Sequence, residues 1–232
     1  MSINLSIIIP CYNEENTIFL IVEKIKKLES LTPEIIIIND CSTDNTSDIL
    51  KKISQLYPDI KIVTHEKNSG KGAAIRSGIK LVTGNIVLLQ DADLEYDPND
   101  YHNLLQPFAE TDADIVYGTR FRGGKYVRLH FFWHYLANKI LTTITNIVTN
   151  LNMSDMETGY KVFKSHVIKN IKLNENSFGI EPEITIKLAK KKYIFYEVPI
   201  RYNGRSYEEG KKITLKDAFI AIYCIFRYRW FN

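Results

Sequence analysis

The chain has 232 residues, of which 45% are hydrophobic and 25% are charged, and its formal net charge is +3. This composition is typical of a globular domain with a sizeable core and excludes a disordered chain. The small net charge, without long blocks of like charge, gives no indication of nucleic-acid binding. Cys11, Cys41 and Cys224 lack metal-type spacing, and the N-terminus shows no basic, cleavable leader, so a cytoplasmic protein is expected.

The first half of the chain alternates short apolar runs with amphipathic segments. The apolar runs predict strands over 5–9, 35–38, 60–64, 86–89 and 114–117. Helical patterns cover 15–28, 43–56 and 71–82, and Asp97 with Pro98 supplies an N-cap and a first-turn proline for another helix. This alternation predicts one α/β domain with a parallel sheet and helices on both of its faces, followed by a functional extension after Arg120.

Carboxylates follow the fourth predicted strand. Because residues 86–89 contain no polar residue, the strand is expected to be covered on both faces, with Asp91 and Asp93 at its carboxyl end, where open α/β sheets bind ligands. In extended chain these two side chains point to the same side, and Glu95 shares their parity. They would repel each other unless a cation such as Mg²⁺ or Mn²⁺ lay between them. A solvated acidic turn is the alternative reading.

Polar residues also follow the other strands at the same edge of the sheet. Tyr12 can pack against a ring, and Asp40 can accept hydrogen bonds from a nucleoside. Lys71 lies in a glycine-rich turn before a helix, where charge and backbone N–H groups meet a pyrophosphate. Taken alone, each feature is explained more simply by helix capping or by turn formation than by nucleotide binding.

Taken together, four motifs resemble those of the family 2 glycosyltransferases of the GT-A fold, most closely the polyprenyl- or dolichyl-phosphate sugar transferases. The motifs are Ile-Pro-Cys-Tyr-Asn-Glu, Asn-Asp-Cys-Ser-Thr-Asp-Asn-Thr, Asn-Ser-Gly-Lys-Gly-Ala-Ala and Asp-Ala-Asp-Leu-Glu. The resemblance runs from residue 5 to about residue 212. It implies a Rossmann-like GT-A fold with a mostly parallel central sheet, and metal-dependent, inverting transfer from GDP-mannose or a UDP-sugar to a polyprenyl phosphate. A saccharide acceptor, or a catalytically silent module that binds nucleotide sugars, is the alternative.

The resemblance also implies a set of site residues. The metal ion, Mg²⁺ or Mn²⁺, would be held by Asp91, Asp93 and Glu95, the last of which replaces the family's usual glutamine. Catalytic roles fall to Asp155, Arg120 and Asp93. The residues implied for the nucleotide sugar are Pro10, Tyr12, Asn13, Glu14, Asp40, Lys71, Asp91, Ala92, Asp93 and Arg120.

The second half of the chain is expected to bind the acceptor. Arg120 matches the family's arginine after Gly-Ser and is the first candidate for phosphate contact, since arginine pairs bidentately with phosphate oxygens. Asp155 is the candidate base or acceptor-orienting residue, although it could simply cap a turn. A phosphate monoester is already an anion at neutral pH, so it would need little base catalysis. Weaker phosphate candidates are Arg122, Arg128, Arg201 and Arg205.

Two apolar stretches bear on membranes. Polar residues interrupt 131–151, which predicts an amphipathic helix at the sheet edge or the membrane surface rather than a spanning one. Residues 213–232 are expected to form a second unit after a catalytic domain of 1–212. Its amphipathic helix would lie at an anionic lipid surface or pack on the protein's own core. We therefore expect a cytoplasmic protein, which docking of this helix would make peripheral on the cytoplasmic face of a membrane. A membrane-anchored partner and a homo-oligomer are the candidate assemblies. The apolar face of this helix comprises Leu215, Phe219, Ile222 and Phe226.

Overall fold

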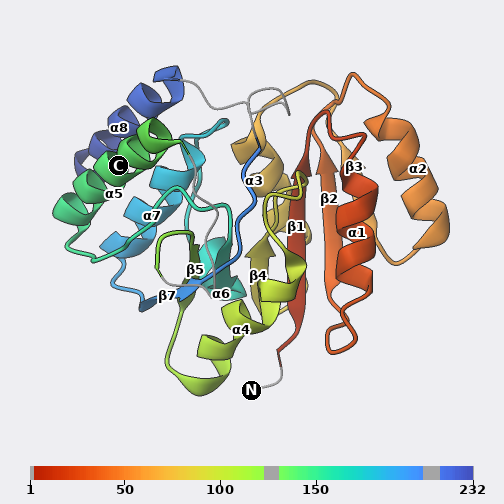
Figure 1. Cartoon of the computed structure of the whole chain (residues 1–232), viewed down its shortest axis with the longest axis horizontal. Helices are drawn as coiled ribbons and strands as arrows, with labels where there is room; N and C mark the ends of the chain where they lie inside the picture. The colour runs from red at the N-terminus through yellow and green to blue at the C-terminus, as the bar shows by residue number, and fades with distance from the viewer. Residues whose placement is uncertain (1–2, 123–130, 206–214, 232) are drawn as a thin grey trace.

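The computed structural model describes residues 3–122, 131–205 and 215–231, and a seven-stranded sheet forms its centre (Figure 1). The strand order is β3-β2-β1-β4-β6-β5-β7. Only β6 runs antiparallel to its neighbours, so the prediction of an α/β fold with a mostly parallel sheet is confirmed. The strands are β1 (Leu5–Cys11), β2 (Glu34–Asn39), β3 (Lys61–Thr64), β4 (Ile86–Leu89), β5 (Ile115–Thr119), β6 (Lys161–Lys164) and β7 (Phe195–Pro199).

Helices cover both faces of the sheet. In Figure 1, α5, α7 and α8 gather at one flank and α1 and α2 at the other. None of the helices in the described part of the chain is long and apolar enough to cross a bilayer. The helices are α1 (Ile18–Lys26), α2 (Thr46–Leu56), α3 (Lys71–Leu81), α4 (Tyr101–Glu110), α5 (Phe132–Thr149), α6 (Ser165–Lys169), α7 (Ile180–Lys190) and α8 (Leu215–Trp230), with a 3₁₀ turn at Pro98–Asp100.

Helices α1 and α2 each begin three residues later than the sequence pattern predicts. The residues before them form loops that bind each other, because Glu15 N donates to Asp44 Oδ2 at 3.2 Å and Asn45 N donates to Glu15 Oε2 at 2.8 Å. These side-chain bonds satisfy backbone N–H groups that would have no intrahelical partner in helices that began at the predicted positions. The loops at the carboxyl ends of β1 and β2 are therefore fixed to one another.

Alternation along the strands divides the core in two, as expected for a sheet buried on both faces. Ile8, Val87 and Leu89 pack with residues of α3, α6, α7 and α8. Ile7, Ile9 and Leu88 pack on the opposite face with residues of α1, α2 and α4. β4 is buried along its whole length at the middle of the sheet, so the residues that follow it emerge at the centre of the carboxyl edge.

Helix α8 packs on the core with one face only. Ala221, Cys224, Ile225 and Tyr228 are buried in the same cluster as residues of α7. The Tyr228 hydroxyl donates to Glu175 Oε1 at 2.6 Å. The opposite face is exposed, and it carries Phe219 and Phe226 from the apolar face identified in the sequence. The division into 1–212 and 213–232 stays a prediction, since its boundary falls at 206–214, outside the described residues.

Candidate active site

The chain does not continue as a strand through the acidic motif after β4. Leu94 adopts a left-handed conformation with φ of 62°, and Asp93 Oδ1 accepts a hydrogen bond from Glu95 N at 3.1 Å. This tight turn ends the alternation of side chains on which the predicted parity of Glu95 depended. The expectation that three acids point to one side of an extended chain is therefore wrong.

Glu95 binds a neighbouring segment instead. Its Oε2 accepts from the Tyr202 hydroxyl at 2.9 Å, and its Oε1 accepts from Arg205 N at 2.7 Å. With both oxygens engaged, Glu95 fixes the chain that follows β7 and does not fit the role of third metal ligand. Among the described residues, no group of three or more acidic, histidine or cysteine side chains has a metal-binding arrangement.

Asp91 and Asp93 remain as the pair that fits a divalent cation. Burial, together with the charges of Asp91 and Glu95, raises the pKa of Asp93 to about 7. A carboxylate crowded by like charges is stabilised by a cation. Mg²⁺ is commonly held by one or two carboxylates together with water and substrate phosphates, and Mn²⁺ prefers the same oxygen ligands. Two protein carboxylates at the middle of the carboxyl edge meet this requirement.

Lys71 lies at the start of α3, as predicted, directly after Gly70 with φ of 94°. Its ammonium group is 2.8 Å from Asp91 Oδ1 and 3.1 Å from Glu181 Oε1. Burial alone would lower the pKa of Lys71, but these two carboxylates raise it well above its ordinary value. Glu181 is paired in turn with the fully buried Lys161 at 2.5 Å.

This chain of alternating charges, from Asp91 through Lys71 and Glu181 to Lys161, joins β4 to α7 beneath the site. Sequence reasoning identified its first two members and missed Glu181 and Lys161. Both acids of the Glu-Pro-Glu start of α7 are buried, which is rare for carboxylates unless they are paired. The pair of acids in the first turn of this helix was the feature of the sequence that could have indicated the buried ion pairs.

The predicted nucleoside-binding residues line the adjacent loops. Pro10 and Tyr12 are partly exposed, whereas Ala92 is buried. Asn13 Oδ1 accepts from Thr43 N at 2.8 Å and so ties the two loops together. Asp40 accepts from the backbone N–H groups of Ser69 and Gly70 and lies 2.7 Å from His65 Nδ1. Asp40 therefore shapes the turn before Lys71, which is a role that the sequence did not suggest.

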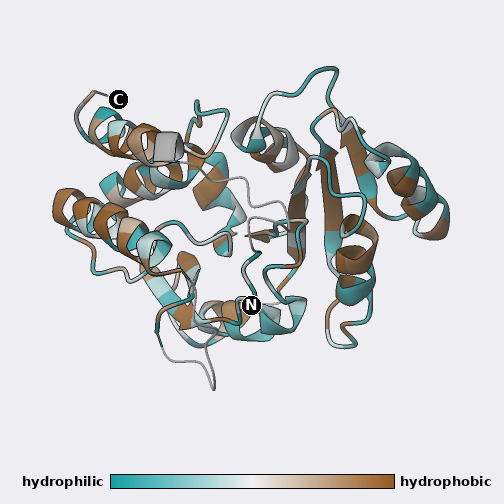
Figure 2. Cartoon of the chain, turned by 45° about the horizontal axis from the view of Figure 1, so that its top comes forward, coloured by the Kyte–Doolittle hydropathy of each residue, from teal (hydrophilic) through white to brown (hydrophobic). Residues whose placement is uncertain are grey.

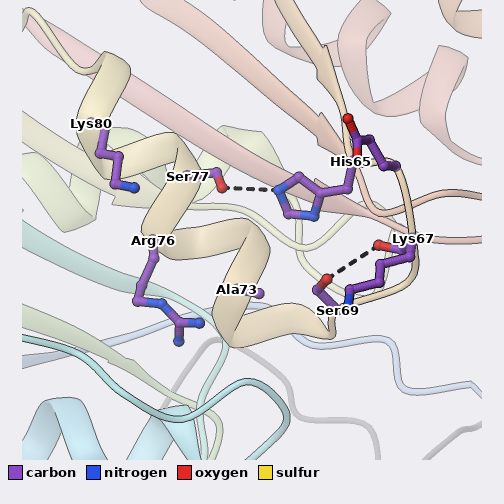
Figure 3. A pocket seen from close by; sticks show the side chains of 8 residues that line it. His65, Lys67, Ser69, Ala73, Arg76, Ser77 and Lys80 are labelled. Atoms are coloured by element: carbon purple, nitrogen blue, oxygen red, sulfur yellow. Dashed lines mark hydrogen bonds between the residues drawn. The ribbon is translucent and has the colours of Figure 1, made fainter.

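A hollow of about 350 Å³ opens between His65 and the exposed flank of α3 (Figure 3). The second ring nitrogen of His65, Nε2, lies 2.9 Å from Ser77 Oγ, which extends the contact from Asp40 to α3. None of the site residues predicted from the sequence lines this hollow. Its lining residues are His65, Glu66, Lys67, Ser69, Ala73, Arg76, Ser77 and Lys80.

Arg120 and Asp155 form a bidentate ion pair. Arg120 Nε and Nη2 donate to the two carboxylate oxygens at 2.6 and 2.7 Å, and Arg120 N donates to Oδ2 at 3.1 Å. Asn138 from α5 donates to Oδ1 at 3.1 Å, and Asp155 is 0% exposed. A buried carboxylate with four hydrogen bonds is poorly suited to take a proton from a substrate. The geometry supports an orienting role for Asp155, through Arg120, rather than the role of base.

The other arginines differ in position. Arg205 reaches back over the acidic turn, where it pairs with Glu14 at 2.7 Å and donates to the Asp93 carbonyl oxygen. Arg201 follows β7 and pairs with Asp100 at 3.2 Å, with its side chain 54% exposed. The side chain of Arg122 is 53% exposed and lies 3.5 Å from Glu197, and Arg128 falls outside the described residues. Arg120 and Arg205 are thus the arginines that the structure brings to the site.

Comparisons with known proteins identify the family and the fold of the chain. The profile of the family described as Glycosyl transferase family 2 matches residues 6–172. Dolichol-phosphate mannosyltransferase of Pyrococcus furiosus is 30% identical over 90% of this chain and 60% of its own length. Dolichyl-phosphate beta-glucosyltransferase ALG5A of Trichomonas vaginalis is 29% identical over 87% of this chain and 66% of its own length. The chain therefore spans about two thirds or less of each of these relatives.

A solved structure shares the fold. Glucosyl-3-phosphoglycerate synthase from Mycobacterium tuberculosis, crystallised with Mn²⁺, UDP and phosphoglyceric acid, superposes with a TM-score of 0.75 over 100% of this chain and 80% of its own. The sequence identity is 18%, so this likeness concerns the fold alone. The match of the family profile to most of the chain, together with this fold, shows that the protein belongs to glycosyl transferase family 2 and has a GT-A fold.

Proposed function

We propose that the protein transfers a hexose from a nucleoside diphosphate sugar to the phosphate of a polyprenyl lipid, with Mg²⁺ or Mn²⁺. The observation that carries this proposal is the proximity of Arg120 to an apolar surface. The side chain of Phe121 packs against Tyr135 of α5 with ring centroids 5.2 Å apart. The same helix supplies Asn138, which binds Asp155 beneath Arg120. An arginine that suits a phosphate therefore lies at the edge of a surface that suits a lipid.

On the donor side, Asp91 and Asp93 would hold the metal ion and Lys71 would approach the diphosphate. A bound divalent ion would neutralise the charge that develops on the departing nucleoside diphosphate. Arg205 closes the other side of the acidic turn through Glu14 and the Asp93 carbonyl oxygen. This placement orients the donor at the centre of the carboxyl edge and contributes through positioning and electrostatics.

On the acceptor side, Asp155 holds Arg120 in one orientation, and the guanidinium group stacks over the Tyr202 ring at 5.0 Å. A phosphate monoester is already ionised at neutral pH and needs no base to become a nucleophile. The lack of an accessible carboxylate at Asp155 is thus compatible with a phosphate acceptor. A saccharide hydroxyl, by contrast, would require a base.

Helices α5 and α8 form what we call the aromatic surface. They contact each other, and Figure 2 shows them at one flank with long hydrophobic stretches. Trp133 is 75% exposed and Phe219 is 73% exposed, and the exposed Arg227 and Arg229 lie on α8. Exposed aromatic groups beside basic ones favour the interface of an anionic bilayer. The aromatic surface comprises Phe131, Phe132, Trp133 and Tyr135 near α5, and Phe219, Tyr223, Phe226 and Trp230 on α8.

A screen of UDP- and GDP-sugars, with and without polyprenyl phosphate and Mn²⁺, tests the reaction. We expect transfer only when the lipid phosphate and the metal are both present. Transfer to soluble saccharides alone would contradict the assignment of a lipid acceptor, but the assignment of glycosyltransferase activity would stand. Absence of transfer with every donor, although nucleotide sugars bind, would favour a silent binding module.

Membrane docking is tested by point substitutions, because deleting α8 would also remove buried core residues. Trp133→Ser combined with Phe226→Ser should reduce sedimentation with anionic liposomes about tenfold and leave the melting temperature within a few degrees. Leu56→Ser on α2, at a side chain that is 60% exposed on the other flank, is the matched control. Equal sedimentation of the double variant and the control would exclude docking through this surface.

A further inference from the structure

The turn over residues 155–159 connects the two halves of the site. It begins at Asp155, under Arg120, and ends at Gly159, whose backbone packs directly on Asp91. A Cβ atom at Gly159 would lie 2.2 Å from Asp91 Oδ2, and Gly159 N donates to the Tyr96 hydroxyl at 2.9 Å. The middle of this turn therefore lies between the donor side and the acceptor side.

Two polar atoms in the middle of the turn are buried without a hydrogen-bond partner among the described residues. They are Glu157 Oε1 and Thr158 Oγ1, and Thr158 is 0% exposed. The nearby cations are already engaged, since Lys161 binds Glu181 and the Thr158 carbonyl oxygen, and Arg120 binds Asp155. Leaving such atoms without a partner is costly, and it is unusual in a folded protein unless a ligand supplies the missing bonds.

We infer that Glu157 and Thr158 form the subsite that binds hydroxyl groups of the hexose being transferred. This inference rests on the proposed function and names the part of the donor that these residues recognise. Sugar hydroxyls both donate and accept hydrogen bonds, so adjacent hydroxyl groups of a hexose complement a carboxylate oxygen next to a threonine hydroxyl.

The surroundings of Glu157 suit this role. Burial and the charge of Glu181 raise its pKa to about 7, so that near neutral pH its carboxyl group can accept or donate a hydrogen bond. A phosphate, in contrast, would be repelled by the ionised form of Glu157, because Lys161 and Arg120 nearby are already paired with other carboxylates. The chemistry of the turn thus selects a neutral polyol over a second anion, while the diphosphate falls to Lys71 and the Asp91–Asp93 pair.

Calorimetric binding to the full chain with Mn²⁺ tests this assignment, with UDP against UDP-glucose and GDP against GDP-mannose as ligand pairs. Glu157→Ala should weaken binding of the sugar nucleotide about tenfold to hundredfold and change binding of the free nucleotide less than about twofold. Thr158→Val, which keeps the shape of the side chain, should give a smaller loss with the same selectivity. Glu157→Gln, which preserves volume, should fall between wild type and Glu157→Ala. Glu29→Ala, at an exposed acid in the loop after α1, is the matched control.

The outcomes distinguish failure of the proposed function from failure of the hexose subsite alone. If the wild-type protein binds none of the four ligands, the proposed function fails and the inference fails with it. If the wild-type protein binds them and the variants bind the sugar nucleotide equally well, only the hexose subsite is wrong. Equal weakening of nucleotide and sugar-nucleotide binding would assign Glu157 to the nucleotide or to the fold, and would also overturn the inference.

Discussion

Carboxylates at the two ends of the sheet have pKa values that are shifted in opposite directions. At the amino end, Glu34 accepts hydrogen bonds from Ser6, from Lys61 at 2.6 Å, and from Thr83 N and Oγ1 at 2.9 and 2.8 Å. Burial would raise the pKa of Glu34, but these donors outweigh burial and lower it to about 2. At the carboxyl end, burial and neighbouring acids raise the pKa of Asp93 to about 7.

This difference distinguishes a carboxylate that stabilises the fold from carboxylates that are suited to bind a ligand. A carboxylate whose partners all come from the protein stabilises the fold and needs no ligand. The acidic turn after β4 holds more negative charge than its lysine and arginine partners neutralise. Such a turn costs stability in the free protein and gains it when a cation binds. The carboxylate at the amino end of the sheet therefore needs no ligand, whereas we propose that substrate and metal complete the carboxyl end.

The largest expected effect comes from Asp93→Asn. This change removes one of the two carboxylates that fit the metal and should lower metal-dependent transfer about a thousandfold. The melting temperature should stay the same or rise, because the substitution relieves repulsion with Asp91 and Glu95. Transfer assays with Mn²⁺ and thermal denaturation of one preparation check both parts. Unchanged turnover would show that the crowded acids do not serve catalysis.

Asp155→Asn should have the next largest effect, about a hundredfold loss of transfer with nucleotide binding retained. The change removes the charge that orients Arg120, and breaking this buried pair should also cost about 3 kcal/mol of unfolding free energy. A double-mutant cycle with Arg120→Ala distinguishes orientation from base catalysis. If Asp155 acts through Arg120, the double variant should be no slower than the slower single variant. If the rate losses of the two single variants instead multiply in the double variant, Asp155 acts independently of Arg120, as a base would.

Gly159→Ala should weaken metal-dependent nucleotide binding about tenfold. The new methyl group would lie 2.2 Å from Asp91 Oδ2 and 2.8 Å from the Tyr96 ring, so the carboxylate must shift. Overpacking of this kind costs about 1 to 3 kcal/mol of stability. Calorimetric titration of a nucleoside diphosphate with Mn²⁺ and then with EDTA should show the loss only with the metal. An equal loss in EDTA would mean that the turn contacts the nucleotide itself.

Glu34→Gln should give the smallest effect, on stability alone. Because the folded pKa of Glu34 lies below its ordinary value of 4.5, its charge stabilises the fold above about pH 4.5 and loses this effect as the pH falls towards 2. We expect a cost of about 1 to 2 kcal/mol at pH 7 after solvent screening, shrinking at pH 3, with unchanged transfer. Chemical denaturation at the two pH values measures this change. A cost that is the same at both would assign it to packing.

The first half of the fold was predictable because local periodicity carries it. The strands from β1 to β5 and helices α1 to α3 fall close to the predicted ranges, since Ile- and Val-rich runs alternate with amphipathic segments. Asp97 caps a 3₁₀ turn at Pro98–Asp100, and α4 begins after it at Tyr101. The pattern did not reveal β6, α6, α7 or β7. β6 inserts antiparallel between β4 and β5, and its neighbours are set by long-range pairing that no short window of sequence contains.

The site divides in the same way. The sequence predicted that Asp91, Asp93 and Lys71 lie at one edge of the sheet, because the carboxyl ends of parallel strands meet there. The partner of each side chain was not predictable. Glu95 turns away because Leu94 adopts a left-handed conformation that ends the extended chain. Asp155 is saturated by Arg120, which follows β5, and by Asn138 of α5. Contacts between distant elements decide which acids remain available to a ligand.

The central claim is that Asp91 and Asp93, without Glu95, bind a divalent ion together with a nucleoside diphosphate. A crystal of the full chain grown with Mn²⁺ and UDP or GDP, and measured for anomalous scattering from manganese, tests it directly. We predict one peak about 2.0 to 2.3 Å from an oxygen of Asp91 or Asp93 and from diphosphate oxygens, with Glu95 still bound to Tyr202. A manganese peak coordinated by Glu95, or nucleotide bound at this edge with no metal beside either aspartate, would contradict the account.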